Sequence, residues 1–252
     1  MPDVLVEICC GSLEDVLAAQ EGGADRVELC AALCVGGLTP SAGAILESKA
    51  RLRLPVMVMV RPRAAGFRYR DSEVAVMERD VLAAVASGAD GIVLGALRDH
   101  GSIDGAACRR LRSAAGDRQV VFHRAFDLTP DPFRALEELI DLGFTRVLTS
   151  GQRTSAVLGA PTLRRLVEAA RDRIEILPGG GIRPHNVRQV VDETGCRQVH
   201  LSAFGTEADP STASRPELTF LADHPPADQY ARTDVAKVRE IVRALRPVSS
   251  RS

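Results

Sequence analysis

Two stretches of this sequence end in the same carboxylate–apolar–thiol triplet, "EIC" at residues 7–9 and "ELC" at residues 28–30. Each triplet closes an aliphatic run that is typical of a buried β-strand. Side chains alternate between the two faces of a strand, so the carboxylate and the thiol of each triplet share one face. If the strands are neighbours, about 4.8 Å apart, two carboxylates and two thiols converge. Such a cluster can hold a soft metal ion or perform acid–base chemistry.

Other polar residues follow further strand-like runs, and we expect them to form a rim around the triplets. The predicted rim consists of Glu7, Glu28, Arg61, His123, Arg124 and Asp127. The two arginines are suited to clamp an anion, His123 suits proton transfer, and Asp127 is placed to orient His123 or Arg124. The alternative is a structural layer of ion pairs, because a buried carboxylate is costly unless it is paired. Cys10 is expected to point outward, and His200 is either a core residue or part of the site.

A glycine-rich stretch, "PGGGIRP" at residues 178–184, predicts a different kind of site. Glycines let backbone N–H groups approach an anion, and a following helix would present its positive N-terminus. Gly179, Gly180, Gly181 and Ser202 are therefore predicted to bind an anionic group. A tight turn that merely requires glycine is the alternative.

The elements that must position these residues repeat along the chain, since a helical stretch ends at Gly and an aliphatic strand begins a few residues later. The predicted strands span residues 3–9, 26–30, 55–61, 91–96, 119–124, 145–149, 174–178 and 197–202. Eight such units in a chain of 252 residues predict an α/β fold with one (β/α)8 barrel domain over residues 1–252. A doubly wound sheet is less favoured, because no Gly-x-Gly-x-x-Gly follows the first strand. Residues 206–233 are predicted to be a polar loop, 234–246 a closing helix and 247–252 a frayed tail.

Composition narrows the possible functions. The net charge of −1 argues against a nucleic-acid or anionic-membrane binder, and no apolar run has the length of a membrane span. The N-terminal residues do not resemble a signal peptide, so the six cysteines are expected to be free thiols in a cytoplasmic protein. The only lysines, Lys49 and Lys237, lie in helical stretches, which excludes a Schiff-base lysine at a strand end.

With these residues in view, the sequence resembles the CutC family, described as copper homeostasis proteins. The matching stretches are "EICC", "GGADRVELCA", "GGLTPS", "VRPR", "GFRY", "FHRAFD", "RVLTSGQ" and "PGGGI", in order across residues 4–204. The resemblance implies a barrel, a cytoplasmic location, a homodimer or higher oligomer, and a copper site at Cys9 and Cys30. The chain departs from the family in "RPRAAGF", where an acid is missing before Phe67, in Val35, and in the extra thiol of Cys34.

Two functions follow. The first is Cu(I) binding by Cys9 and Cys30, because soft thiolates select Cu(I). The second is an acid–base enzyme of the hydrolase or isomerase type that acts on a small anionic or phosphorylated, sugar-like substrate, because copper does not need the polar rim. A regulator or scaffold is less consistent with so many ionisable residues on one face.

Overall fold

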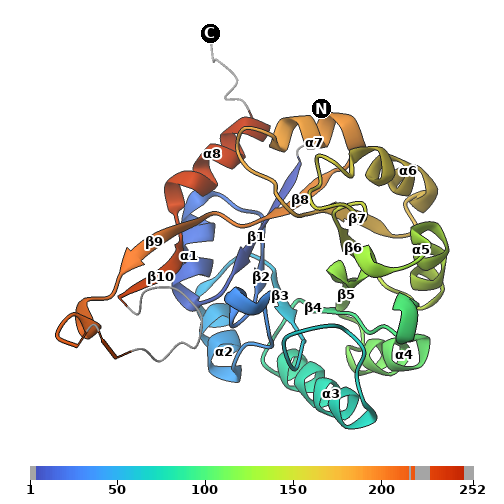
Figure 1. Ribbon diagram of the computed structural model, residues 1–252, viewed down its shortest axis with the longest axis horizontal. Coiled ribbons are helices and arrows are strands. Elements are labelled where there is room, and N and C mark those ends of the chain that lie inside the picture. Colours follow the sequence, from blue (N-terminus) through green and yellow to red (C-terminus); the bar gives the residue numbers. More distant parts are fainter. Residues whose placement is uncertain (1–3, 216, 219–227, 247–252) are drawn as a thin grey trace.

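The computed structural model describes residues 4–215, 217–218 and 228–246, and these form a nearly closed (β/α)8 barrel (Figure 1). The eight parallel barrel strands are β1 Leu5–Cys10, β2 Arg26–Leu29, β3 Val56–Met59, β4 Gly91–Leu94, β5 Gln119–Phe122, β6 Arg146–Thr149, β7 Glu175–Pro178 and β8 Gln198–Leu201. The eight helices are α1 Leu13–Gly22, α2 Ala42–Arg51, α3 Asp71–Ala86, α4 Gly105–Ala114, α5 Pro132–Asp141, α6 Ala160–Ala170, α7 Val187–Thr194 and α8 Val235–Leu245. The predicted fold and all eight predicted strands are confirmed, with strand ends differing by one or two residues.

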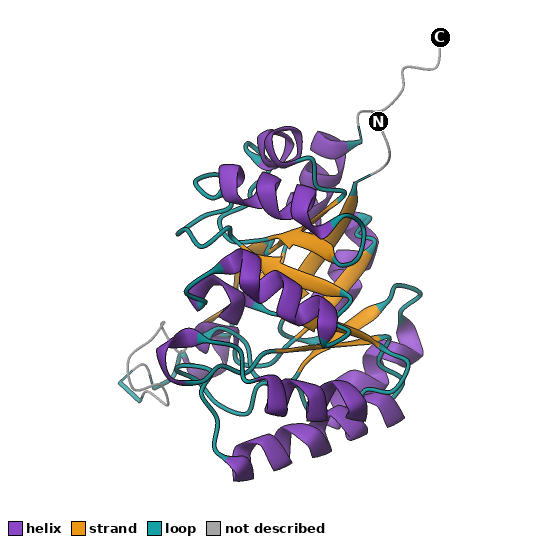
Figure 2. Cartoon of the chain, turned by 90° about the vertical axis from the view of Figure 1, so that its right-hand side faces the viewer, coloured by secondary structure: helices purple, strands orange, loops and turns teal. Residues whose placement is uncertain are grey.

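Each strand pairs with its neighbour in the sequence, and β8 pairs with β1. An isolated parallel bridge between Gly179 and His200 joins β7 to β8 and completes the ring. The helices lie outside the strands, as the side view in Figure 2 shows. No helix within the described residues combines the length and the apolar character that a membrane crossing requires.

Local signals explain where the helices begin and end. Ser12 caps α1 by accepting a hydrogen bond from the backbone N–H of Asp15, and Gly23 ends the same helix in the left-handed conformation. Asp131 caps α5, with Pro132 in its first turn. These caps fix the ends of the helices and therefore the short loops that lead into each strand.

The strands separate two layers of buried side chains. The larger layer lies between strands and helices, and Cys10 belongs to it. The smaller layer fills the barrel interior and contains Cys9 and Cys30 with Met57, Met59 and four aliphatic residues. The prediction that Cys10 points outward is therefore confirmed.

The structure differs from the sequence-based expectation in two segments. Residues 206–233 were expected to be a loop, but this segment begins and ends in strands, β9 Phe204–Ala208 and β10 Gln229–Thr233, which pair as an antiparallel hairpin beside α1 and α8 (Figure 1). The pattern was missed because the hairpin is largely solvent-exposed and lacks an apolar face. The helix that was expected to follow the glycine-rich stretch directly, α7, begins only at Val187. The predicted frayed tail lies outside the described residues.

Candidate functional site

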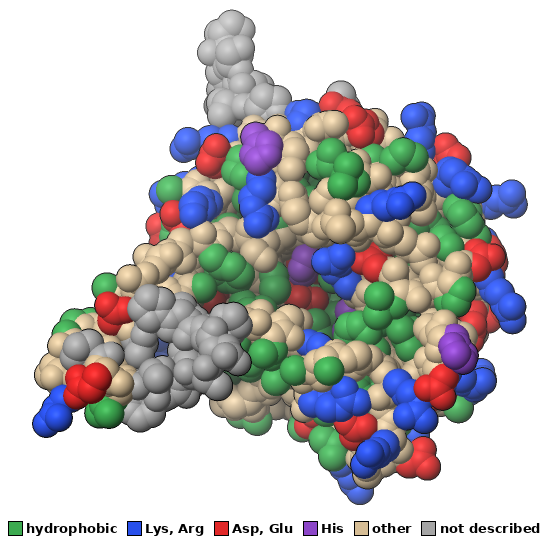
Figure 3. Space-filling view, in the orientation of Figure 1, with side chains coloured by type: hydrophobic (Ala, Val, Ile, Leu, Met, Phe, Trp, Pro, Cys, Tyr) green, Lys and Arg blue, Asp and Glu red, His purple; other side chains and the backbone are tan. Residues whose placement is uncertain are grey.

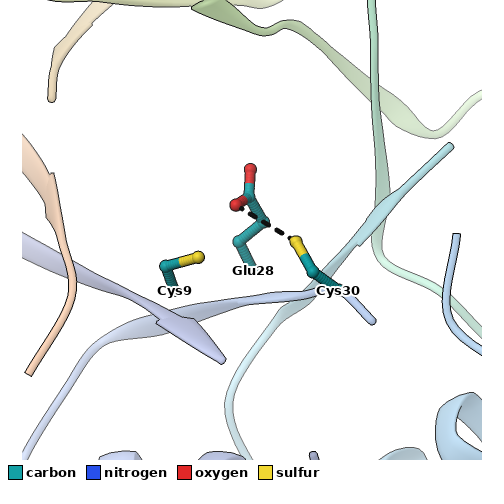
Figure 4. Close-up of side chains that lie close together, drawn as sticks. All are labelled: Cys9, Glu28 and Cys30. Carbon is teal, nitrogen blue, oxygen red and sulfur yellow. Dashed lines mark hydrogen bonds between the residues drawn. The ribbon is translucent and has the colours of Figure 1, made fainter. Parts of the chain in front are cut away.

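The strand register places the two triplets side by side. Cys9 pairs with Glu28 across β1 and β2, and Glu7 pairs with His200 across β1 and β8. The thiols of Cys9 and Cys30 and a carboxylate oxygen of Glu28 all lie within 4.8 Å of one another. Figure 4 shows these side chains converging, with the thiol of Cys30 donating to Oε2 of Glu28 over 3.5 Å and the other carboxylate oxygen pointing away. The predicted convergence of thiols and carboxylates is thus present in the structure.

Cys9 and Glu28 line a cavity of about 240 Å³ at the carboxyl ends of the strands, and Cys30 is buried behind them. A hollow is visible near the centre of Figure 3, with histidine, acidic and basic side chains inside it. Four of the rim residues expected from the sequence line this cavity, namely Glu28, Arg61, His123 and Arg124. His200 and Ser202 line it as well, whereas Glu7 and Asp127 do not.

Glu7 lies below the cavity in a layer of buried polar groups. Its carboxylate forms an ion pair with Arg26, and its Oε1 lies 2.7 Å from Nδ1 of His200. Arg26 also donates to Gln198 over 2.8 Å. Burial alone would raise the pKa of Glu7, but the guanidinium of Arg26 and the contact with His200 lower it to about 2. For Glu7, the structure therefore agrees with the alternative expected from the sequence, a structural layer of ion pairs.

His200 connects this layer to the thiols. Its Nε2 lies 3.8 Å from Oε2 of Glu28, and its ring also contacts the thiol of Cys9. Burial alone would lower the pKa of His200, but Glu28, Cys9 and Glu7 raise it well above its usual range. His200 is therefore part of the site.

The two thiols and the acid between them differ in protonation. The hydrogen bond from Cys30, together with His200, lowers the pKa of the Cys9 thiol to about 5 despite its burial. The contact with Cys9 and burial raise the pKa of Cys30 well above its usual range. Burial raises the pKa of Glu28 to about 8. Cys9 is therefore the thiol that ionises first, and Cys30 keeps the proton that it donates to Glu28.

Arg61 serves the loops that surround the cavity. Its terminal nitrogens donate to the carbonyl oxygens of Val35, Gly37 and Ala65 at 2.7 to 3.0 Å, and its guanidinium stacks over the ring of Phe67. Most of its donors are therefore used to hold the loops after β2 and β3. Among the described residues no partner accepts from its buried Nε.

His123 is neutral. Its Nδ1 accepts a hydrogen bond from the backbone N–H of Ala125, which places the ring proton on Nε2. Burial, together with the charge of Arg61, lowers the pKa of His123 to about 3. The geometry therefore makes His123 a hydrogen-bond donor at neutral pH.

Arg124 and Asp127 act as a pair at the rim. Nε of Arg124 donates to Asp127 over 2.8 Å, and a terminal nitrogen donates to Ser150 over 3.0 Å. Asp127 also accepts from Thr149 over 2.6 Å, which ties this turn to the end of β6. Of the two partners expected for Asp127, the structure selects Arg124.

The glycine-rich stretch has structural reasons for its composition. Gly180 and Gly181 adopt positive φ angles of 97° and 70°. A Cβ on Gly180 would lie 3.3 Å from the guanidinium of Arg124. Helix α7 begins only at Val187, so its N-terminus does not directly follow the glycines. Ser202 lines the cavity, whereas the three glycines do not.

The sequence reasoning missed two residues. Arg26 precedes Glu28 by two positions on the same strand face, and that alternation was the signal that could have identified it as the partner of Glu7. Met59 lines the cavity and packs in the same interior cluster as both thiols. Its thioether is a soft donor of the kind that Cu(I) accepts. Cys34, the extra thiol, is exposed and outside the thiol–carboxylate cluster.

Comparisons with known proteins agree with this architecture. The chain is 44% identical over 246 residues to a family protein CutC of Treponema denticola, which covers 97% of this chain and all of the relative. It is 43% identical to the human copper homeostasis protein cutC homolog, covering 94% of this chain and 87% of the human protein. A crystal structure named for the copper homeostasis protein CutC of Streptococcus agalactiae superposes with a TM-score of 0.76 at 39% identity, covering 79% of this chain and 98% of that one.

Similarity in fold extends further than similarity in sequence. The N-(5'-phosphoribosyl)anthranilate isomerase of Pyrococcus furiosus superposes with a TM-score of 0.56 at 17% identity, over 97% of this chain and all of that one. This likeness concerns the barrel alone. The model of the CutC family matches residues 4–205, so the chain belongs to the CutC family.

Proposed function

We propose that this protein acts in copper homeostasis by binding one Cu(I) ion between the thiolates of Cys9 and Cys30. The observation that supports this proposal is the convergence of both thiols with Glu28 within 4.8 Å, at the wall of a cavity. Soft sulfur ligands select Cu(I), and Met59 offers a third soft donor in the same interior cluster. Glu28 offers only hard oxygen atoms, which add little to the selectivity for Cu(I).

The protonation of the site suits this role. A metal ion binds thiolates, so the low pKa of Cys9 supplies one ligand without a large cost at neutral pH. Cys30 must release its proton when copper binds. Its thiol donates to Oε2 of Glu28, which lies next to it. We place the protein in the cytoplasm, where thiols stay reduced.

The test is an anaerobic titration of reduced protein with Cu(I) against a competing chelator. Wild type is expected to hold one equivalent, and both Cys9→Ser and Cys30→Ser are expected to lose it. The control is Cys108→Ser, which removes an equally buried thiol from α4, outside the barrel interior. If wild type and both site variants compete equally weakly, the copper proposal is wrong.

A second candidate function is catalysis by the same groups. Glu7 contacts Nδ1 of His200, and the other edge of the ring faces Cys9 and Glu28. A base oriented by a carboxylate and placed next to a thiol is the arrangement that nucleophilic and acid–base enzymes use. The substrate would be a small anionic or phosphorylated metabolite, with Gly179, Gly180, Gly181 and Ser202 as the proposed binding segment for a phosphoryl group.

This second candidate is tested by turnover. Metal-free protein is incubated with phosphorylated and sugar-like metabolites, and product formation is followed by mass spectrometry. Turnover that is lost in His200→Asn and retained in Cys108→Ser would support an enzyme. The absence of turnover across the panel would count against it while leaving the copper proposal intact.

The oligomeric state also remains a proposal. We infer a homodimer or a higher homo-oligomer from family membership. Light scattering of the purified protein measures the mass in solution, and a value near 27.0 kDa would contradict the inference.

A further inference from the structure

Two buried polar atoms at the cavity have no partner among the described residues. They are Oε1 of Glu28, on β2, and Nε2 of His123, at the end of β5. Both residues line the same cavity, and each is only 3% exposed. A buried polar atom without a hydrogen bond is costly, and native proteins leave few of them. Copper held by the two thiols would satisfy neither atom, so both atoms are available to a further ligand.

The chemistry of the occupant follows from the hydrogen positions. His123 accepts at Nδ1 from the backbone, so Nε2 carries the proton and requires an acceptor. Its ring is fixed in this orientation by Phe67, whose centroid lies 4.7 Å away. Glu28 presents a carboxyl oxygen whose companion oxygen already accepts from Cys30. A hydroxyl group can accept from His123 and can hydrogen-bond to Glu28 in either protonation state of the acid, because a hydroxyl is both donor and acceptor.

Arg124 adds a requirement for negative charge. Its side chain is 45% exposed at the rim, and Asp127 and Ser150 hold its guanidinium in place through two of its nitrogens. Its other terminal nitrogen lies near Gly180, and no acceptor for it is found among the described residues. A fixed guanidinium with a spare donor suits a carboxylate. Of the residues that line the cavity, Glu28 alone is acidic.

The size of the cavity limits the occupant. A volume of about 240 Å³ lies below the range of 300 to 1,000 Å³ that is usual for drug-sized ligands. This volume is that of about eight water molecules at roughly 30 Å³ each. Leu33, Phe67 and Phe204 provide apolar walls. The cavity therefore has room for a short carbon chain, but its lining offers no partner for a second charged group on the ligand.

We propose that this cavity binds a small 2-hydroxycarboxylate, with the carboxylate on Arg124 and the hydroxyl between His123 and Glu28. The site names a ligand class for the second candidate function, but it is measured by binding and does not require turnover or copper. Copper binding can fail while this site is retained, and this site can fail while copper binding is retained.

The experiment is calorimetry on reduced, metal-free protein with glycerate and lactate as probes. Saturable binding is expected for at least one of them. Propionate, which lacks the hydroxyl, and glycerol, which lacks the charge, are each expected to bind about tenfold more weakly, since a buried polar group that is left without its partner costs about 1 to 3 kcal/mol. Inorganic phosphate is tested in parallel, because Arg124 alone would also bind that anion.

Two variants make the result specific. Arg124→Gln is expected to weaken binding at least about tenfold, and its partly exposed position keeps the fold intact. His123→Phe removes the donor while keeping the ring volume, and it is expected to reduce the preference for glycerate over propionate. The control is Arg183→Gln, which removes an exposed arginine at a neighbouring cavity. The proposal is overturned if neither hydroxy acid binds, if phosphate alone binds, or if Arg124→Gln binds as wild type does.

Discussion

Glu7 holds two cationic side chains in the barrel interior, and this makes it the most sensitive single residue of the site. The carboxylate is 2% exposed and contacts both Arg26 and His200. Removing one partner of a buried ion pair costs about 3 to 5 kcal/mol, because the remaining charge is left without compensation.

We therefore expect Glu7→Gln to lower the free energy of unfolding by about 3 kcal/mol in urea denaturation. The matched control is Glu47→Gln, which breaks an exposed pair with Arg51 on α2 and is expected to cost less than about 1 kcal/mol. Equal losses in the two variants would show that the Glu7 layer does not stabilise the barrel.

His123 makes acid stability depend on one buried neutral ring. The folded pKa of about 3 lies below the unfolded value near 6.5, so the unfolded state takes up the proton first as the pH falls. Above pH 6.5 the ring is neutral in both states, and its protonation does not affect the free energy of unfolding. Below that pH the free energy of unfolding falls progressively towards about pH 3.

His123→Asn keeps an acceptor for the N–H of Ala125 but cannot titrate. Between pH 7 and pH 4.5 the wild type is expected to lose about 2 to 3 kcal/mol more than this variant, as measured by urea denaturation at each pH. His185→Asn, at an exposed position, is the control and is expected to follow the wild-type curve. Parallel curves for wild type and His123→Asn would contradict the assignment of a buried neutral ring.

At the scale of elements, the turn after β7 helps to position Arg124, because a glycine in this turn lets the guanidinium approach the backbone closely. Gly180 and Gly195 both have positive φ, at 97° and 70°. A Cβ on Gly180 would lie 3.3 Å from both the guanidinium of Arg124 and the side chain of Ser150, whereas a Cβ on Gly195 would meet open space. The two glycines thus share the backbone requirement and differ in their surroundings.

We expect Gly180→Ala and Gly195→Ala each to cost about 1 kcal/mol, because a left-handed conformation is unfavourable for alanine. Only Gly180→Ala should also move Arg124, because only there would the added Cβ press against the guanidinium. The measurement is the Nε–H resonance of Arg124 by NMR. A resonance that stays unchanged in Gly180→Ala would show that the close approach does not position the arginine.

The same elements show what the sequence could predict. The Gly-ended helices and continuous apolar strands were sufficient for the barrel, because both patterns are local. Strand alternation also placed Glu7 and Cys9 on one face of the first strand and Glu28 and Cys30 on one face of the second. Two assignments needed long-range contacts instead: Arg61 against the loop carbonyls, and the burial that keeps His123 neutral. Residue type alone does not reveal which donors are already used by the backbone.

At the scale of the whole molecule, the two ends of the barrel sequence close against each other. β8 pairs with β1, and α8 packs on α1. Gly22 allows this contact, because a Cβ at that position would lie 2.4 Å from the side chain of Val238. The site depends on this closure, since His200 reaches Glu7 and Cys9 only across the β8–β1 seam.

Val238→Ala should therefore weaken the entire barrel rather than one helix. Val238 is fully buried, and its truncation is expected to cost about 2 kcal/mol. Unfolding in urea is followed by circular dichroism and by mass-spectrometric labelling of Cys108, a buried thiol on α4. Both transitions should move to lower urea by the same amount, whereas Val76→Ala, at an exposed position on α3, should move neither. A shift in the circular dichroism transition alone would mean that α8 detaches independently, and the seam that holds His200 would then be a local contact rather than part of one cooperative unit.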